Sequence, residues 1–194
     1  MGRHALQDYN HLSSTDIQNI RQWYLEAHGN QLQERSYVTD KQLHNFLRIP
    51  IIRHAFPEAR IVHVIRAPLD NCFSIFENNF SGFHRYSHGL EDLGNYYLMY
   101  AEYMDTCRTL APDFFYDLNY QDLVDNPEEE IRKLLAYCSL EFDTSCLTPH
   151  KTNRTVTTAS KVQVRTPINR SSIQRWKVFE RQLKPLIDIL GAPD

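Results

Sequence analysis

An arginine and a serine eight positions apart lie on either side of a predicted helix start. The stretch "ARIVHVIRAPLDNCFSIF" (59–76) ends an apolar segment at Arg66, and Pro68 favours the first turn of a helix that carries Ser74. Arginine grips phosphate bidentately, and a hydroxyl adds another hydrogen bond. Ala67, at the expected cap position, offers no side-chain acceptor to the first-turn N–H groups. A bound anion would satisfy these groups.

The same residues also allow a purely structural interpretation. Arg66 can form an ion pair with Asp70 while water fills the uncapped turn. Ser74 lies two turns into the helix, so its hydroxyl reaches an anion only if that anion lies along the helix flank. Spacing alone leaves both interpretations open.

A second basic, hydroxyl-rich segment favours the anion. Residues 144–172 have no regular pattern, and a loop of this length is usually functional or disordered. The apolar positions Val162, Val164 and Ile168 argue against a merely solvated loop. In a chain of net charge −3, residues 153–176 gather the cationic and hydroxyl side chains Arg154, Lys161, Arg165, Arg170, Arg175, Ser160, Ser171 and Ser172.

The elements that must position these residues alternate between strands and helices. "ARIVHVI" (59–65) predicts a strand, apolar as buried parallel strands are, and "DFFYDLNY" (113–120) predicts another. "SYVTD" (36–40) is short and β-prone. This order favours an α/β fold with a mainly parallel sheet. Helices are predicted over 14–29, 44–56, 68–80, 90–111, 126–140 and 172–191.

Helix-terminal residues refine these boundaries. Thr15 or Ser14 is expected to cap the first helix, and Asn126 the fifth. Pro50 is expected to begin or kink the second helix. Glycines are expected to end the first and last helices, at Gly29 and Gly191.

Composition and absent motifs exclude several classes of function. The 194 residues are expected to form a single domain (1–194), and the weak net charge does not favour nucleic-acid or membrane-surface binding. No apolar run approaches the roughly 20 residues that span a bilayer. The four cysteines form no C-x-x-C pair, which suits a reducing, cytoplasmic setting.

The chain also lacks G-x-x-x-x-G-K-[ST] and G-x-S-x-G, the motifs of P-loop kinases and α/β-hydrolases. His84 and His88 have a spacing that suits a metal, but no third ligand is near, so no metal is expected.

Five motifs in order carry a resemblance to a known family. The chain resembles the catalytic domain of sulfotransferases that use 3′-phosphoadenosine 5′-phosphosulfate (PAPS), especially bacterial ones often fused to tetratricopeptide repeats, and more distantly tyrosylprotein sulfotransferase. The likeness covers residues 36–190 and implies a P-loop-NTPase-like sulfotransferase fold, a parallel sheet flanked by helices. The motifs are "TDKQLHNF" (39–46), "FPEARIVHVIRAPLDNCFS" (56–74), "NYQDLVDNPEEEIRKLL" (119–135), "TASKVQVRTPIN" (158–169) and "SSIQRW" (171–176).

The resemblance implies roles for individual residues in binding PAPS or its product 3′-phosphoadenosine 5′-phosphate (PAP). Arg66 and Ser74 look like the pair that holds the 3′-phosphate, and Tyr120 like the tyrosine that contacts the nucleotide. The remaining implied positions are Ser160, Val164 and Arg165, in a loop over the adenosine diphosphate, and Arg175, near the phosphates.

The implied reaction moves a sulfuryl group from PAPS to an acceptor hydroxyl or amine without a metal. Lys41 looks like the lysine beside the transferred group, where it would stabilise charge on the bridging oxygen, and it is expected at a strand end. His44 is the first candidate for a general base, with Glu34 and Asp40 as rivals. Asp40 is expected instead to orient Lys41.

The family's N-terminal strand and Gly-rich 5′-phosphosulfate loop have no counterpart before residue 36, so both are expected to be missing. A sheet edge left exposed in this way is often covered by dimerisation, so a homodimer is an expectation. The alternative to an active sulfotransferase is a truncated, non-catalytic PAP-binding or interaction module derived from one. The acceptor, whether small molecule, carbohydrate or peptide, is not encoded in any motif.

Overall fold

The computed structural model describes residues 11–29, 37–78, 84–151 and 165–191. The chain divides into two compact units, one of Met1–Ile61 with Ala101–Phe114 and one of Val62–Tyr100 with Phe115–Asp194. The long helix α6 (Leu90–Leu110) contributes its first half to the second unit and its second half to the first.

The first unit is helical in its described residues. It contains α2 (Ser14–Ala27), the 3₁₀ turn η2 (Asn45–Arg48), α4 (Ile49–Ala55), the end of α6 and the turn η4 (Pro112–Phe114). Residues 37–42 have no regular structure, so the β-prone stretch forms no strand in its described part and Lys41 is not at a strand end. Pro50 lies in the first turn of α4, which confirms helix entry there.

The cap of α2 lies earlier than either predicted serine or threonine. Ser13 is extended, and its hydroxyl accepts from the Asp16 N–H at 3.1 Å while the Asp16 carboxylate accepts from the Ser13 N–H at 2.9 Å. This reciprocal capping box satisfies the backbone N–H groups of Ser13 and Asp16, so Ser14 and Thr15 are helical instead. The helix ends at Ala27, with His28 rather than Gly29 as its C-cap.

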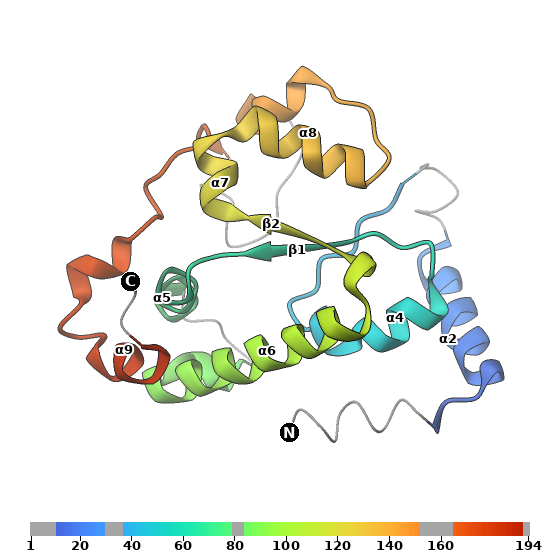
Figure 1. Cartoon of the computed structure of the whole chain (residues 1–194), viewed down its shortest axis with the longest axis horizontal. Coiled ribbons are helices and arrows are strands. Elements are labelled where there is room, and N and C mark those ends of the chain that lie inside the picture. Colours follow the sequence, from blue (N-terminus) through green and yellow to red (C-terminus); the bar gives the residue numbers. More distant parts are fainter. Residues whose placement is uncertain (1–10, 30–36, 79–83, 152–164, 192–194) are drawn as a thin grey trace. The chain divides into compact units, whose positions relative to one another are not determined.

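The second unit contains a two-stranded parallel sheet of β1 (Ile61–Ile65) and β2 (Phe115–Asn119) (Figure 1). Figure 1 shows α5 (Pro68–Asn78) following β1 and α7 (Tyr120–Asp125) following β2 at the same end of the sheet. The expectation of a fully buried β1 is wrong. Side chains alternate between the faces of a strand, and on one face Val62 and Val64 are 36% and 55% exposed.

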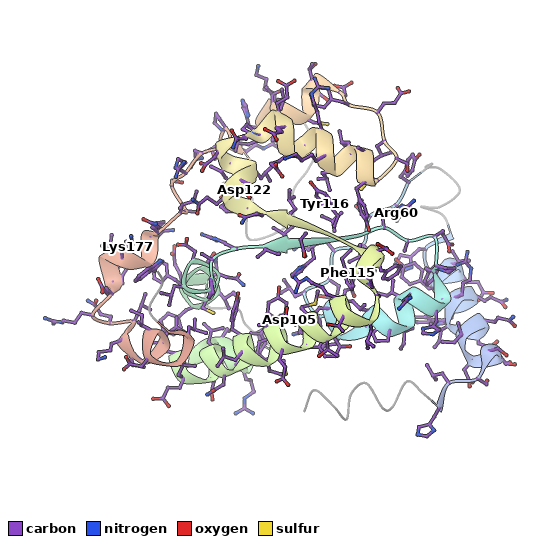
Figure 2. The ribbon with its side chains drawn as sticks, viewed as in Figure 1. Arg60, Asp105, Phe115, Tyr116, Asp122 and Lys177 are labelled. Atoms are coloured by element: carbon purple, nitrogen blue, oxygen red, sulfur yellow. The ribbon has the colours of Figure 1, made fainter. Side chains whose placement is uncertain are left out.

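Side chains tie the sheet to its flanking helices. His63 Nδ1 lies 2.7 Å from an Asp117 carboxylate oxygen across the two strands, and its Nε2 contacts the Tyr100 hydroxyl on α6. On the other face, Tyr116 extends from β2 toward α8 (Pro127–Tyr137) (Figure 2). Its ring stacks on that of Tyr137, with centroids 5.3 Å apart. The contact between His63 and Asp117 joins β1 to β2, and the other two join the sheet to α6 and α8.

The helix predicted over 126–140 is observed as α8, and a short helix that was not predicted, α7, precedes it. Asn119 caps α7, because its side-chain oxygen accepts from the Gln121 N–H at 2.8 Å. Tyr120 is therefore the first residue of a helix and not the last residue of a strand. Asn126 occupies the cap position of α8 but makes no side-chain cap hydrogen bond, so that prediction is wrong.

The core of the second unit joins α5, α6 and the C-terminal segment. It buries Leu69, Cys72 and Phe73 of α5, Leu93 of α6, Trp176, Leu183 and Leu186. Gly94 allows close packing here, because a Cβ at this position would lie 2.9 Å from the Ile189 side chain.

The C-terminal segment is not one helix. The 3₁₀ helix η9 (Arg175–Phe179) is followed by turns and then by α9 (Lys184–Leu190). Gln174 has a left-handed backbone (φ 57°), and Pro185, in the first turn of α9, cannot donate a hydrogen bond to a preceding turn. Gly191 (φ 85°) ends α9, as predicted.

The described residues also form the 3₁₀ turns η3 (Arg85–His88), η5 (Thr144–Leu147) and η6 (Pro149–Lys151). Within the described ranges, no helix combines the length and the apolar character that crossing a bilayer requires.

Candidate functional site

Arg66 lies where β1 passes into α5, as predicted. Its side chain is partly buried, and one terminal N–H donates to the Ser172 backbone carbonyl at 2.5 Å. Its Nε is buried and has no hydrogen-bond partner. Since a buried donor without a partner is costly, Arg66 retains an unused hydrogen-bond donor at this atom.

The ion pair between Arg66 and Asp70, which the purely structural interpretation requires, is absent from the described residues. Asp70 is 4% exposed, its Oδ1 has no partner, and no ion pair joins it to Arg66. The arginine instead packs against Tyr120, with its guanidinium carbon 5.0 Å from the ring centroid. This cation–π contact and the Ser172 carbonyl fix the guanidinium without neutralising it.

A pocket of about 150 Å³ lies beside Arg66. Its cations are Arg66 and Arg175, and the hydroxyl-bearing residues Ser74, Tyr120 and Ser172 also line it. The lining is completed by Phe73, Glu77 and Asn78 of α5.

The pocket lies along the flank of α5 rather than over its first turn. Its lining includes Ser74 and residues one turn further along, but none from Ala67 to Asp70. The pocket therefore lies one to two turns along α5, beside Ser74, and not at the uncapped helix start where the sequence suggested an anion.

Arg175 reaches the pocket because the core anchors its neighbour. Trp176 is 6% exposed and belongs to the hydrophobic core, which fixes η9 beside α5. The Arg175 guanidinium carbon lies 5.7 Å from the Phe73 ring centroid, and a terminal nitrogen lies 3.0 Å from the Glu77 carboxylate. The pocket thus contains two cations and one carboxylate, a net positive charge that suits an anion of phosphate size.

The structure brings together four of the predicted cofactor residues, Arg66, Ser74, Tyr120 and Arg175. Arg165 is exposed and does not line the pocket, and Ser160 and Val164 lie outside the described residues.

The predicted catalytic residues belong to the first unit. Lys41 is exposed, and His44 is partly buried at the start of η2. Asp40 was expected to orient Lys41, but its carboxylate accepts from the Tyr24 hydroxyl at 3.1 Å instead. Glu34 lies outside the described residues.

Sequence reasoning missed Phe73, Glu77, Asn78 and Ser172 as site residues. Glu77 and Asn78 follow Ser74 at i+3 and i+4, which places all three on one helix face and could have identified them. Ser172 was noted only as one hydroxyl of the basic segment. The part of the chain that the structure describes contains no cluster of histidine, cysteine and carboxylate side chains suited to a metal.

Comparisons with known proteins match most of the chain to one family. The family model described as "Sulfotransferase family" matches residues 3–144. An uncharacterized protein of Aquifex aeolicus is 35% identical over 177 residues, which cover 90% of this chain and 23% of that protein.

Two mycobacterial proteins give a weaker match. The omega-hydroxy-beta-dihydromenaquinone-9 sulfotransferases of Mycobacterium bovis and Mycobacterium tuberculosis are each 25% identical over 130 residues, or 59% of this chain and 31% of theirs. The chain thus spans less than a third of the length of each relative. Because the family model covers most of the chain, this protein belongs to the sulfotransferase family.

Proposed function

We propose that this protein binds PAPS through its 3′-phosphate in the Arg66 pocket and serves the transfer of the sulfuryl group to an acceptor hydroxyl or amine. The observation that carries the proposal is the buried, unpartnered Nε of Arg66 in a pocket that also contains Ser74 and Arg175. A phosphate there would accept from Arg66 Nε and from the Ser74 hydroxyl. Family membership supplies the class of reaction.

The pocket volume suits one phosphate rather than a whole nucleotide. Sites for drug-sized ligands occupy about 300–1,000 Å³, whereas this pocket measures about 150 Å³. In the proposal the pocket therefore anchors the end of PAPS away from the reacting sulfur. Tyr120, held against Arg66, offers an aromatic surface to the adjoining nucleoside.

Lys41 and His44 are the proposed catalytic residues. The lysine would stabilise negative charge on the bridging oxygen as the S–O bond breaks, and the imidazole would accept the acceptor's proton. The mycobacterial relatives are named for a hydroxylated acceptor, which supports a hydroxyl as the acceptor group here.

A sulfuryl-transfer assay tests the proposal. The chain is incubated with ³⁵S-labelled PAPS and a panel of phenols, aliphatic alcohols and amines, and PAP binding is measured in parallel by calorimetry. We expect PAP to bind and label to appear on at least one hydroxyl acceptor. PAP binding without transfer to any acceptor would overturn the catalytic part, and absence of PAP binding would overturn the whole proposal.

A further inference from the structure

One carboxylate lies among the cations of the anion pocket. Glu77 lines the pocket on the same face of α5 as Ser74. Both its carboxylate oxygens lie 3.0 Å from one terminal nitrogen of Arg175. Negative charge is unexpected in a site that would hold a phosphate, because like charges a few ångströms apart repel each other.

The pair between Glu77 and Arg175 is one that a ligand can break. The Arg175 and Glu77 side chains are 47% and 41% exposed. Exposed ion pairs contribute little stability, so the guanidinium can leave the carboxylate at small cost when a more highly charged partner arrives. Arg66 differs, because it is held by Tyr120 and the Ser172 carbonyl, neither of which carries a negative charge.

We propose that Glu77 determines the affinity and selectivity of this pocket by competing with the ligand's phosphate for Arg175. In the unliganded pocket Glu77 neutralises Arg175 and leaves Arg66 as the uncompensated cation. A dianionic phosphate monoester displaces the carboxylate, whereas a weakly charged anion does not. The pocket therefore binds a dianionic phosphate monoester more tightly than a singly charged anion, which has Arg66 alone as its cation. This inference rests on the proposed function, since it assigns a role within the same phosphate site.

Another role for Glu77 gives the opposite expectation. If Glu77 only held Arg175 in the orientation that binds phosphate, its removal would free the arginine side chain and weaken binding. The sign of the change in affinity therefore separates competition from positioning.

The experiment measures the PAP dissociation constant by calorimetry for the wild type and Glu77→Gln. Glutamine keeps the size of the side chain and removes its charge, so we expect binding about tenfold tighter. Glu128→Gln is the matched control, because Glu128 forms an equally exposed pair with Arg132 on α8, at 2.6 Å and outside the pocket. This control should leave PAP affinity unchanged.

A double variant tests whether Glu77 acts by competing for Arg175. In Arg175→Gln the carboxylate has no cation to withhold, so adding Glu77→Gln should tighten PAP binding by no more than about threefold. A full tenfold gain in that background would overturn competition for Arg175, as would unchanged or weaker binding in Glu77→Gln itself.

The inference and the proposed function fail in different ways. If the wild type binds PAP and Glu77→Gln brings no gain, only the role of Glu77 is overturned. If neither protein binds PAP, both are overturned.

Discussion

The two regions that the sequence connects with catalysis are built differently. The Arg66 pocket is assembled from a strand end, a helix flank and a core-anchored 3₁₀ helix, and Arg66 itself is fixed by Tyr120 and the Ser172 carbonyl. Lys41, by contrast, is an exposed side chain on a segment without regular structure.

This difference suggests that the Arg66 pocket binds the donor and that Lys41 contributes to turnover. A preorganised phosphate site loses little entropy when its ligand binds, so it can anchor the donor. A lysine on an irregular segment gains its position only when substrate orders it, so its contribution should fall on turnover rather than on binding.

The largest effect is expected from Lys41→Met, which removes the charge and keeps the length of the side chain. Sulfuryl transfer should fall about 10²–10³-fold, the usual loss for one group that stabilises transition-state charge. PAP affinity should stay unchanged, because the proposed 3′-phosphate site belongs to the other unit. Single-turnover transfer and calorimetry measure the two quantities separately.

Lys184→Met is the control for that experiment. Lys184 is 72% exposed and pairs with Asp188 on α9, away from the pocket. A loss of PAP affinity in Lys41→Met as large as its loss of turnover would contradict the proposal that binding and turnover depend on different regions.

A smaller effect is expected on the reactivity of two buried thiols, one in each unit. Burial raises the pKa of Cys72 in the second unit to about 12 and also raises that of Cys107 in the first. Neither thiol should react with a thiol reagent near neutral pH until its unit opens. PAP at 100 times its dissociation constant should slow labelling of Cys72 about 100-fold, by mass action.

Cys107 is the internal reference, because its unit does not contain the pocket. Its labelling rate should change far less than that of Cys72, measured by mass spectrometry after Cys138 and Cys146 are replaced by serine. Equal protection of both thiols would mean that the units open together.

The smallest effect is expected from Ser74→Ala. The hydroxyl contributes one hydrogen bond to a charged phosphate, so its loss should weaken PAP binding about tenfold. Thr109→Ala removes a helical hydroxyl that donates to the Asp105 carbonyl in the first unit, and it should leave affinity unchanged. Equal affinities in the wild type and Ser74→Ala would place the phosphate away from the α5 flank.

Much of the site was predictable because it depends on side chains in a recognisable order. Arg66, Ser74, Tyr120 and Arg175 were each indicated by a motif, and the structure brings all four to one pocket. The Ser172 carbonyl could not be predicted, because every residue carries the same backbone acceptor and only the fold selects one.

The misplaced elements also have physical causes. The sequence offered three adjacent residues able to cap α2, and Ser13 formed the cap because Asp16 lies where it completes a capping box. The C-terminal segment has helical periodicity, but Pro185 and the left-handed Gln174 divide it. The exposure of Val62 and Val64 depends on what covers the sheet, which the composition of the strand does not state.

The central claim is that Arg66 anchors a phosphate, and PAP calorimetry on the wild type and Arg66→Ala tests it most directly. The account predicts that the wild type binds PAP and that the variant binds about 100-fold more weakly, the loss expected for charge-assisted hydrogen bonds to phosphate. Arg132→Ala, which removes an exposed cation of α8, should bind as the wild type does, and circular dichroism should show all three proteins folded. Equal PAP affinity in the wild type and a folded Arg66→Ala would contradict the account.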